Sequence, residues 1–350
     1  PLPSPDFWRG KRVLLTGHTG FKGAWTALWL HRLGARVHGL ALPAPADGLF
    51  AAARLSDIVP GAIADIRDPA AVRAAVQAAE AEIAIHLAAQ PLVRRSLTHP
   101  VETFAVNVMG TVHLLDALRE APWTRAIVAA TTDKVYAPLD ARHAHREDDP
   151  LGGLDPYAAS KAAAEHAIAA MARNFLEPAG VQTIAVRAGN VVGGGDSALD
   201  RLVPDVVRAA AAGRPPLLRH PDATRPWQHV LDCLCGYLLC AEALGDGKPL
   251  PAALNFGPNG ASCLTAGGMA AAAQRALGVV PGWRAGPPDA REAPALALDS
   301  SLARVVLGWG ERWGGRAIAE RTADWHRAHA RGADMRAYSL EHIAEYEATP

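Results

Sequence analysis

The sequence lacks an excess of either charge. Lys and Arg together number 35, and so do Asp and Glu, which gives a formal net charge of zero. A neutral chain has no overall field to attract nucleic acid or an anionic membrane surface, so binding of such partners by general electrostatics is excluded. An anionic ligand must be held by local groups, and we therefore expect a small molecule rather than a polymer.

Cysteine is also scarce, with four in 350 residues, too few for a disulfide scaffold. Cys233, Cys235 and Cys240 lie in one apolar run, where we expect buried free thiols rather than a metal site. The stretch from Ala141 to Arg146 holds two histidines, but nothing nearby completes a ligand set. We therefore expect a solvated loop there and no metal.

Long apolar runs are missing as well. No stretch approaches the roughly 20 apolar residues that cross a bilayer. Residues 1–10 also lack the basic segment and apolar core of a secretion signal. We therefore expect a cytoplasmic protein.

Short apolar runs and helical segments alternate along the first half of the chain. Such alternation predicts an α/β fold with a doubly wound parallel sheet of the Rossmann type. The expected strands cover 12–16, 36–41, 83–88, 126–131 and 183–187, and the expected helices cover about 22–33, 107–120 and 157–174.

Glycine and proline break the chain into short pieces after about Asn190. We expect a cofactor-binding domain over 7–189 and a smaller α/β substrate-binding domain over 190–350. Segment 228–257 has the pattern of a helix and a strand that return to the first domain.

Three glycines, Gly17, Gly20 and Gly23, follow the first expected strand and open the first expected helix. A dinucleotide pyrophosphate can sit on a helix N-terminus only where side chains do not obstruct the backbone. An ordinary strand-to-helix turn explains one glycine but not three at this spacing.

The acid that usually holds the adenosine ribose is not evident after the second expected strand, so NAD and NADP both stay open. Arg36 and Arg54 leave a partner for a 2′-phosphate conceivable. Asp65 offers a carboxylate to the adenine amino group. The alternative for this acidic segment is a helix N-cap ahead of Pro69.

Tyr157 and Lys161 are four residues apart on an expected helix and so share a face, while Thr132 ends an expected strand. A nearby ammonium favours the phenolate, which makes the pair a base for a hydroxyl whose carbon gives up hydride. Thr132 can position the same hydroxyl. The alternative is that Tyr157 and Lys161 merely pack and solvate their helix.

These motifs resemble the extended short-chain dehydrogenases/reductases that act on nucleotide sugars, and most closely the group of CDP-glucose 4,6-dehydratases. The resemblance covers nearly the whole chain. It rests on segments 17–23, 86–94, 107–111, 132–134, 157–161, 187–191, 200–205 and 225–230.

The resemblance implies an NAD-mediated internal redox reaction on a nucleotide sugar such as CDP-glucose, ending in a 4-keto-6-deoxy sugar. Tyr157 would take the proton of the 4-hydroxyl, and Asp133 would protonate the departing 6-hydroxyl. Contacts to the cofactor are implied for Phe21, Lys22, Ile66, Ala88 and Ala89, besides the glycines, Asp65, Tyr157 and Lys161. Contacts to the substrate are implied for Gln90, Asn190, Arg201 and Arg225; a salt bridge is the alternative for each arginine.

Lys134 is a departure from the related dTDP-glucose dehydratases, which have a glutamate as the C5 base at this place. A lysine is a base only if its pKa is lowered, for which burial beside Lys161 is a route. The alternatives are another base, an ion pair with Asp133 or a contact to a substrate hydroxyl. The resemblance also implies a homodimer or homotetramer.

Two other readings of the motifs stay open. A nucleotide-sugar 4-epimerase or a reductase shares Thr132, Tyr157 and Lys161 but has no need of the Asp133–Lys134 pair. A cofactor-binding protein without catalysis usually lacks one of the reacting residues, whereas all three are present here.

Overall fold

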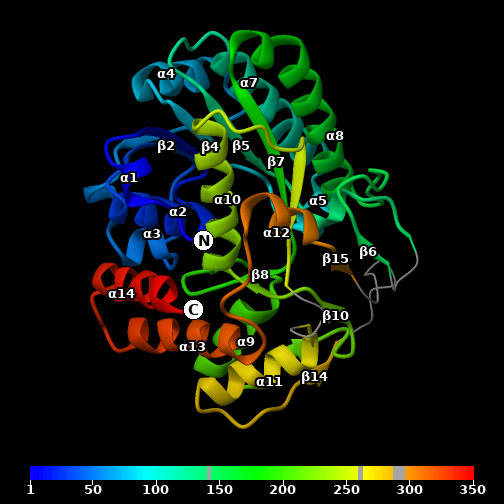
Figure 1. Cartoon of the computed structure of the whole chain (residues 1–350). Helices are drawn as coiled ribbons and strands as arrows, with labels where there is room; N and C mark the ends of the chain where they lie inside the picture. Colours follow the sequence, from blue (N-terminus) through cyan, green and yellow to red (C-terminus); the bar gives the residue numbers. More distant parts are fainter. Residues whose placement is uncertain (140–142, 259–262, 287–295) are drawn as a thin grey trace.

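Figure 1 shows the computed structural model, which describes residues 1–139, 143–258, 263–286 and 296–350. Its main sheet has seven parallel strands in the order β3-β2-β1-β4-β5-β7-β12. The order in which strands are added reverses between β1 and β4: β2 and β3 extend the sheet on one side, and β5, β7 and β12 extend it on the other. Doubly wound sheets bind ligands at such a switch point. The strands are β1 (Arg12–Thr16), β2 (Arg36–Ala41), β3 (Gly61–Ile63), β4 (Ile83–His86), β5 (Ala126–Ala130), β7 (Gln182–Ala188) and β12 (Ala253–Phe256).

Helices cover both faces of this sheet. Alternate strand residues point to opposite faces, so Val13 and Val128 join the apolar cluster with α2 and α10, while Leu14 and Ile127 join the one with α4 and α7. The helices are α1 (Pro5–Trp8), α2 (Phe21–Arg32), α3 (Leu49–Ala52), α4 (Pro69–Ala79), α5 (Val93–Thr98), α6 (Pro100–Phe104), α7 (Gly110–Arg119), α8 (Pro156–Met171), α9 (Leu202–Ala211), α10 (Val230–Gly245), α11 (Ala266–Ala276), α12 (Ser301–Leu307), α13 (Arg316–Ala330) and α14 (Met335–Ala348).

Short elements complete the fold. The single-turn segments are η1 (Leu55–Asp57), η2 (Ala105–Met109), η3 (Asp133–Val135), η4 (Ala172–Leu176) and η5 (Glu177–Ala179), of which η2 and η4 are π-helical. The short strands are β6 (Ala144–His145), β8 (Val191–Val192), β9 (Leu217–Leu218), β10 (Thr224–Arg225), β11 (Gln228–His229), β13 (Leu264–Thr265), β14 (Arg284–Ala285) and β15 (Ala297–Leu298).

The predicted fold class is confirmed, and each of the five expected strands is present within one or two residues at its ends. The strand expected within segment 228–257 is β12, which pairs with β7. Only β3 lacked a clear apolar run, because as an edge strand it is largely exposed. Gly61 brings it against β2, since a Cβ there would lie 2.4 Å from the Gly39 oxygen.

The second half of the chain contributes side chains to two hydrophobic cores. Val206, Trp227, Met269 and Ile318 form a small cluster with α9, α11 and α13, below the sheet in Figure 1. The last helix, α14, instead packs against α2 and α3, and its Tyr346 lies edge-on to Trp29. Residues 190–350 are therefore not packed as one separate unit.

The four cysteines are unpaired, and the three in α10 are buried, as expected. None of the helices within the described residues is both long and apolar enough to span a membrane.

Candidate active site

The glycine turn lies between β1 and α2 and keeps the backbone bare. Gly17 has φ +74°. A Cβ on it would lie 2.7 Å from the nitrogen of Ala88, which is in the loop after β4, the strand beside β1 in the sheet. A Cβ on Gly23 would lie 2.0 Å from the Gly17 oxygen. Gly20 is the N-cap of α2 and has no side chain to cover the free N–H groups there. The turn therefore offers the open helix N-terminus that a pyrophosphate needs.

We expect Gly17→Ala to lower the free energy of unfolding by about 3 kcal/mol or more. The left-handed φ costs a side chain roughly 1–2 kcal/mol, and the clash with Ala88 adds to this cost. Gly10 is the matched control, because it has φ +76° and a Cβ added to it would meet nothing within 4 Å. Urea unfolding should show Gly10→Ala losing only the backbone cost; equal losses would contradict a close approach at Gly17.

Phe21 and Lys22 begin α2 and line the same cavity as the glycines. The Lys22 ammonium lies 3.4 Å from the Tyr237 hydroxyl on α10. His18 is buried instead, with its ring in the space left by Gly39, where a Cβ would lie 2.4 Å away. Burial lowers the pKa of His18 to about 4, so it is a neutral packing residue at physiological pH.

The residues directly after β2, where an acid is usual, are apolar, and Asp47 is the acid of this segment that lines the cavity. Leu42 and Pro43 line it after β2. Arg36 lies at the opposite, amino end of β2, and Arg54 is outside the cavity, with its guanidinium 4.0 Å from Asp334. Neither arginine is placed to bind a 2′-phosphate here, which favours NAD over NADP.

Asp65 and Ile66 line the cavity after β3. The N-cap of α4 is Asp68, which accepts from the Ala70 and Ala71 nitrogens, so Asp65 is not needed as a cap. Hydrogen bonds from Arg67 lower the pKa of Asp65 and keep it ionised. Both oxygens of this carboxylate accept from Arg67, and the residue lies at the cavity wall.

Ala88 and Ala89 follow β4 and line the cavity, but Gln90 does not. The Gln90 side chain accepts from the Leu92 nitrogen at 2.7 Å and donates to Thr103 Oγ1 at 2.9 Å. This placement differs from the expected substrate contact, because its hydrogen-bonding groups hold the loop that carries Pro91 and Leu92.

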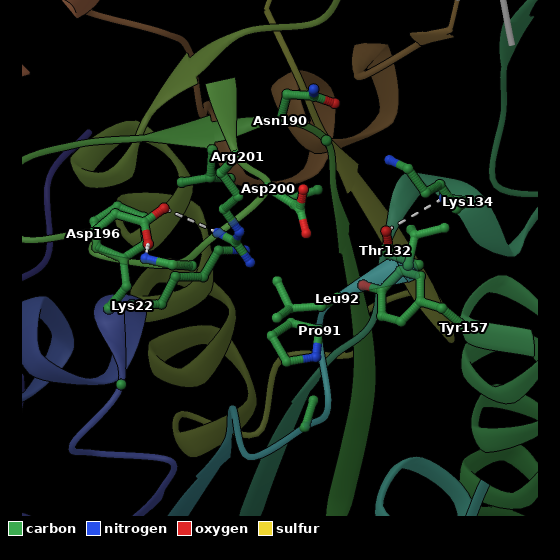
Figure 2. Close-up of a pocket in the computed structure, with 18 of the residues that line it drawn as sticks. Lys22, Pro91, Leu92, Thr132, Lys134, Tyr157, Asn190, Asp196, Asp200 and Arg201 are labelled. Carbon is green, nitrogen blue, oxygen red and sulfur yellow. Dashed lines mark hydrogen bonds and ion pairs between the residues drawn. The ribbon is translucent and has the colours of Figure 1, made fainter. Parts of the chain in front are cut away.

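Thr132 and Tyr157 lie next to each other on one wall, as Figure 2 shows. Thr132 Oγ1 donates to Asp133 Oδ1 at 3.0 Å, and the Tyr157 phenol lies beside the same threonine. Burial raises the pKa of Tyr157, and Thr132 and Lys134 oppose this rise. A threonine hydroxyl thus stands between the phenol and a carboxylate, an arrangement that can pass a proton.

The Lys161 side chain reaches back to the end of the sheet strand that precedes Thr132. Its ammonium donates to the Ala130 oxygen at 3.0 Å, at the end of β5. Burial, helped by Lys22, lowers the pKa of Lys161 to about 8. Tyr157 and Lys161 both lie on α8, as expected, and Lys134 and Arg201 add positive charge near the phenol.

Asp133 and Lys134 form an ion pair in which Lys134 Nζ lies 3.0 Å from Asp133 Oδ1. The Asp133 side chain is 1% exposed, and its Oδ2 has no hydrogen-bond partner among the described residues. Burial would lower the pKa of Lys134, but Asp133 and Tyr157 outweigh it and raise that pKa. The route expected for a lysine base, burial beside Lys161, is therefore not what the structure contains.

A buried polar network lies behind this pair. Arg187 on β7 donates to Glu165 on α8 and, at 2.7 Å, to the Tyr136 hydroxyl, which donates to Asn255 on β12. Thr131, next to Thr132, donates to Glu165 at 2.5 Å. The network fixes the backbone that carries the reacting residues. In the sequence Arg187 stood out only as part of a motif, because its partners are 22 and 51 residues away.

Polar groups for a phosphate face Thr132 across the cavity. Asn190, Arg201 and Arg225 all line it. Arg201 makes the salt bridge expected as its alternative, to the buried Asp196 at 3.1 Å, and still points into the cavity (Figure 2). Asn190 Oδ1 is buried without a hydrogen-bond partner in the described part of the chain. The sequence did not indicate a role for Arg94 and Arg219, which both form a salt bridge with Asp200 at this wall.

The histidine stretch is not a solvated loop. Ala141 and Arg142 lie outside the described residues, but His143 and His145 line the cavity, and His145 is 6% exposed. Asp149 brings a carboxylate to both rings. The expectation that nothing nearby completes a ligand set was therefore wrong, because a turn between 146 and 149 folds the acid back.

The cavity that joins these groups has a volume of about 1440 Å³. Sites for one small ligand are usually about 300–1,000 Å³. The glycine turn and Asp65 lie in one part, and Thr132, Tyr157 and the arginines lie in another, so the cavity has room for a dinucleotide and a second anionic molecule side by side.

The fold and these groups define a dinucleotide-dependent enzyme, and residues 13–256 match the NAD dependent epimerase/dehydratase family. The chain belongs to this family. It is 42% identical over 349 residues to CDP-glucose 4,6-dehydratase of Salmonella typhimurium strain LT2, covering 97% of each chain.

Solved structures agree with this assignment. UDP-glucose 4-epimerase of Thermus thermophilus, a complex with NAD, is 26% identical with a TM-score of 0.78, over 90% of this chain and 99% of that one. DesIV, the dTDP-glucose 4,6-dehydratase of Streptomyces venezuelae, has the same TM-score at 23% identity, over 93% and 99%, and shares the fold.

Proposed function

We propose that the protein is a lyase that removes water from CDP-glucose and forms CDP-4-keto-6-deoxyglucose, with NAD as its cofactor. The observation that carries the proposal is the buried Asp133–Lys134 pair beside Thr132 and Tyr157. Epimerisation needs no further acid at this place. The identity to the Salmonella enzyme over nearly the full length supports the same substrate.

The residues present fit NAD, because the backbone at Gly17 and Gly23 packs too closely for a Cβ and the N-terminus of α2 at Gly20 has no side-chain cap. The Gly17–Gly23 turn would hold the pyrophosphate, Asp65 the adenine and Lys161 the nicotinamide ribose. When bound, NAD would accept a hydride from C4 of the sugar, and its reduced form would return a hydride to C6 of the sugar.

Tyr157 removes the proton of the 4-hydroxyl in the proposed mechanism, and Thr132 fixes the orientation of that hydroxyl. The pKa of Tyr157 is raised by burial, so it is a stronger base once deprotonated, and the Lys134 ammonium limits the cost of the phenolate. The resulting 4-ketone acidifies the hydrogen on C5.

Asp133 and Lys134 then act as one acid–base pair. Transfer of one proton from the ammonium to the carboxylate makes a neutral amine and a carboxylic acid. The amine takes the C5 proton, the acid gives its proton to the leaving 6-hydroxyl, and the pair returns to its charged form. In water this transfer costs about 9 kcal/mol, from ordinary pKa values about 6.5 units apart.

Substrate binding lowers that cost. The Lys134 side chain is 35% exposed, so a sugar that covers it removes water from the ion pair. Loss of water destabilises two separate charges more than two neutral groups. The unpartnered Asp133 Oδ2 is the oxygen free to meet the 6-hydroxyl.

The diphosphate lies on the arginine side. Arg201 and Arg225 provide planar donor groups suited to phosphate oxygens, and Asn190 adds an amide. Arg225 is also close enough to oppose protonation of Lys134, so it joins the phosphate site to the acid–base pair.

The proposal is tested by incubating the protein with CDP-glucose and a catalytic amount of NAD. We expect loss of one water by mass, an alkali-induced 4-keto-6-deoxy sugar absorbance and no net NADH. Equal turnover of dTDP-, UDP- or GDP-glucose would contradict the CDP assignment. An unchanged mass with an altered sugar configuration would mean epimerisation.

We further propose a cytoplasmic homodimer or homotetramer. Val101, Phe104, Met109 and Phe175 are exposed apolar side chains on α6, η2 and η4, all near α8, and a second copy would cover them. Cytoplasmic conditions keep the unpaired cysteines reduced. We also propose that 7–189 with 228–257 forms the cofactor domain and that α9, α11 and α13 form the substrate-binding part.

A further inference from the structure

The segment 143–149 is held against the catalytic turn. It follows η3, and its end is tied back by the Ala137 nitrogen donating to the Pro150 oxygen and the Gly152 nitrogen donating to the Val135 oxygen. Its strand β6 pairs with β15, as Figure 1 shows. This anchoring places two histidines at the wall of the cavity that also holds Asp133 and Tyr157.

The side chains of His143, His145 and Asp149 converge. His143 Nε2 lies 2.6 Å from Asp149 Oδ2, and His145 Nδ1 lies 3.3 Å from the same oxygen. One ligand-type atom from each residue falls within 4.8 Å of the others. Ligands of a tetrahedral zinc ion, with bonds of about 2.0–2.1 Å, are roughly 3.3 Å apart, so small shifts would close a coordination shell.

The rings are fixed by neighbours rather than free to turn. His145 stacks on Tyr136 with centroids 4.6 Å apart and planes at 3°, and Tyr136 is held by Arg187. The Arg146 nitrogen donates to Asp149 Oδ2 at 2.9 Å and orients the carboxylate. Such supporting contacts are what orient metal ligands in known sites. His145 Nδ1 is buried and has no well-directed hydrogen bond among the described residues.

We propose that His143, His145 and Asp149 form a binding site for a divalent transition metal of the zinc class. Two imidazoles and one carboxylate suit zinc, cobalt or nickel, whereas magnesium and calcium prefer oxygen ligands alone. Both histidines face the cavity, and Asp149 lies behind them. Three protein ligands leave a fourth position toward the cavity, where water or a substrate oxygen can bind.

The test is a titration of the full chain, freed of any affinity tag and of metal, with Co²⁺. We expect one ion per chain, an intense visible absorption typical of four-coordinate cobalt, and displacement by Zn²⁺. His143→Ala should weaken binding by at least about 100-fold, the upper end of what even outer-shell changes cost. His145→Phe should do the same while it keeps the stack on Tyr136.

His166→Ala on the exposed face of α8 is the matched control and should bind Co²⁺ as the unaltered chain does. Absence of saturable binding, or equal affinity in the His143 and His145 variants, would overturn the site. The titration needs no substrate turnover, so its outcome is independent of the proposed dehydratase activity.

Discussion

Tyr157→Phe is expected to lower kcat for CDP-glucose by about 100- to 10,000-fold, the usual contribution of a positioned acid or base. The substitution removes only the phenolic oxygen and leaves the buried ring of α8 in place. Substrate affinity should therefore change little. Steady-state rates and a direct binding titration measure the two effects separately.

Tyr338→Phe is the control for this substitution. Tyr338 is on α14, far along the chain from the cavity residues and absent from the cavity wall, so the same loss of a hydroxyl should leave kcat unchanged. If Tyr157→Phe retained more than about a tenth of the activity, another group would have to remove the 4-hydroxyl proton.

Asp133→Asn and Lys134→Met are expected to separate the two halves of the elimination, each lowering overall kcat by about 100- to 10,000-fold. Both variants keep Thr132, Tyr157 and Lys161, so C4 oxidation should continue, more slowly in Lys134→Met, and the absorbance of reduced nicotinamide should build up. In D₂O, Asp133→Asn should still exchange the C5 hydrogen, because loss of the carboxylate that raises the pKa of Lys134 favours the neutral amine. Lys134→Met should not exchange it, which mass spectrometry of recovered substrate can measure.

The exposed pair Lys248 and Asp246 offers the matched control, since its ammonium lies 3.3 Å from the carboxylate and both side chains face solvent. Lys248→Met should leave kcat and exchange unaltered. C5 exchange that persists in Lys134→Met would assign the base to another group and would leave Lys134 as an electrostatic partner of Asp133 alone.

The local features of the site followed from the sequence. Gly17, Gly20 and Gly23 identified the phosphate turn because a backbone approach needs bare positions, whatever lies around them. Strand alternation and the expected helices predicted the sheet, since periodicity depends only on neighbours along the chain. Tyr157 and Lys161 were placed on one helix face for the same reason.

The roles that depend on partners distant along the chain could not be predicted from the sequence. The Gln90 side chain is hydrogen-bonded to Thr103 and Leu92 and does not line the cavity, and the Lys161 ammonium donates to the Ala130 oxygen. Asp149 reaches His143 and His145 only because the turn from Arg146 to Asp149 folds the chain back toward them. These are contacts across turns and strands, and no period in the sequence encodes them.

The sequence by itself therefore determined the class of sheet, the phosphate turn and the chemical types of the reacting groups, because each depends on backbone freedom or on spacing within one element. Tertiary structure alone decided which charge acts on which group. Lys134 pairs with Asp133, and both Lys134 and Arg201 act on Tyr157, since electrostatic effects depend on distance and burial in three dimensions and not on separation along the chain.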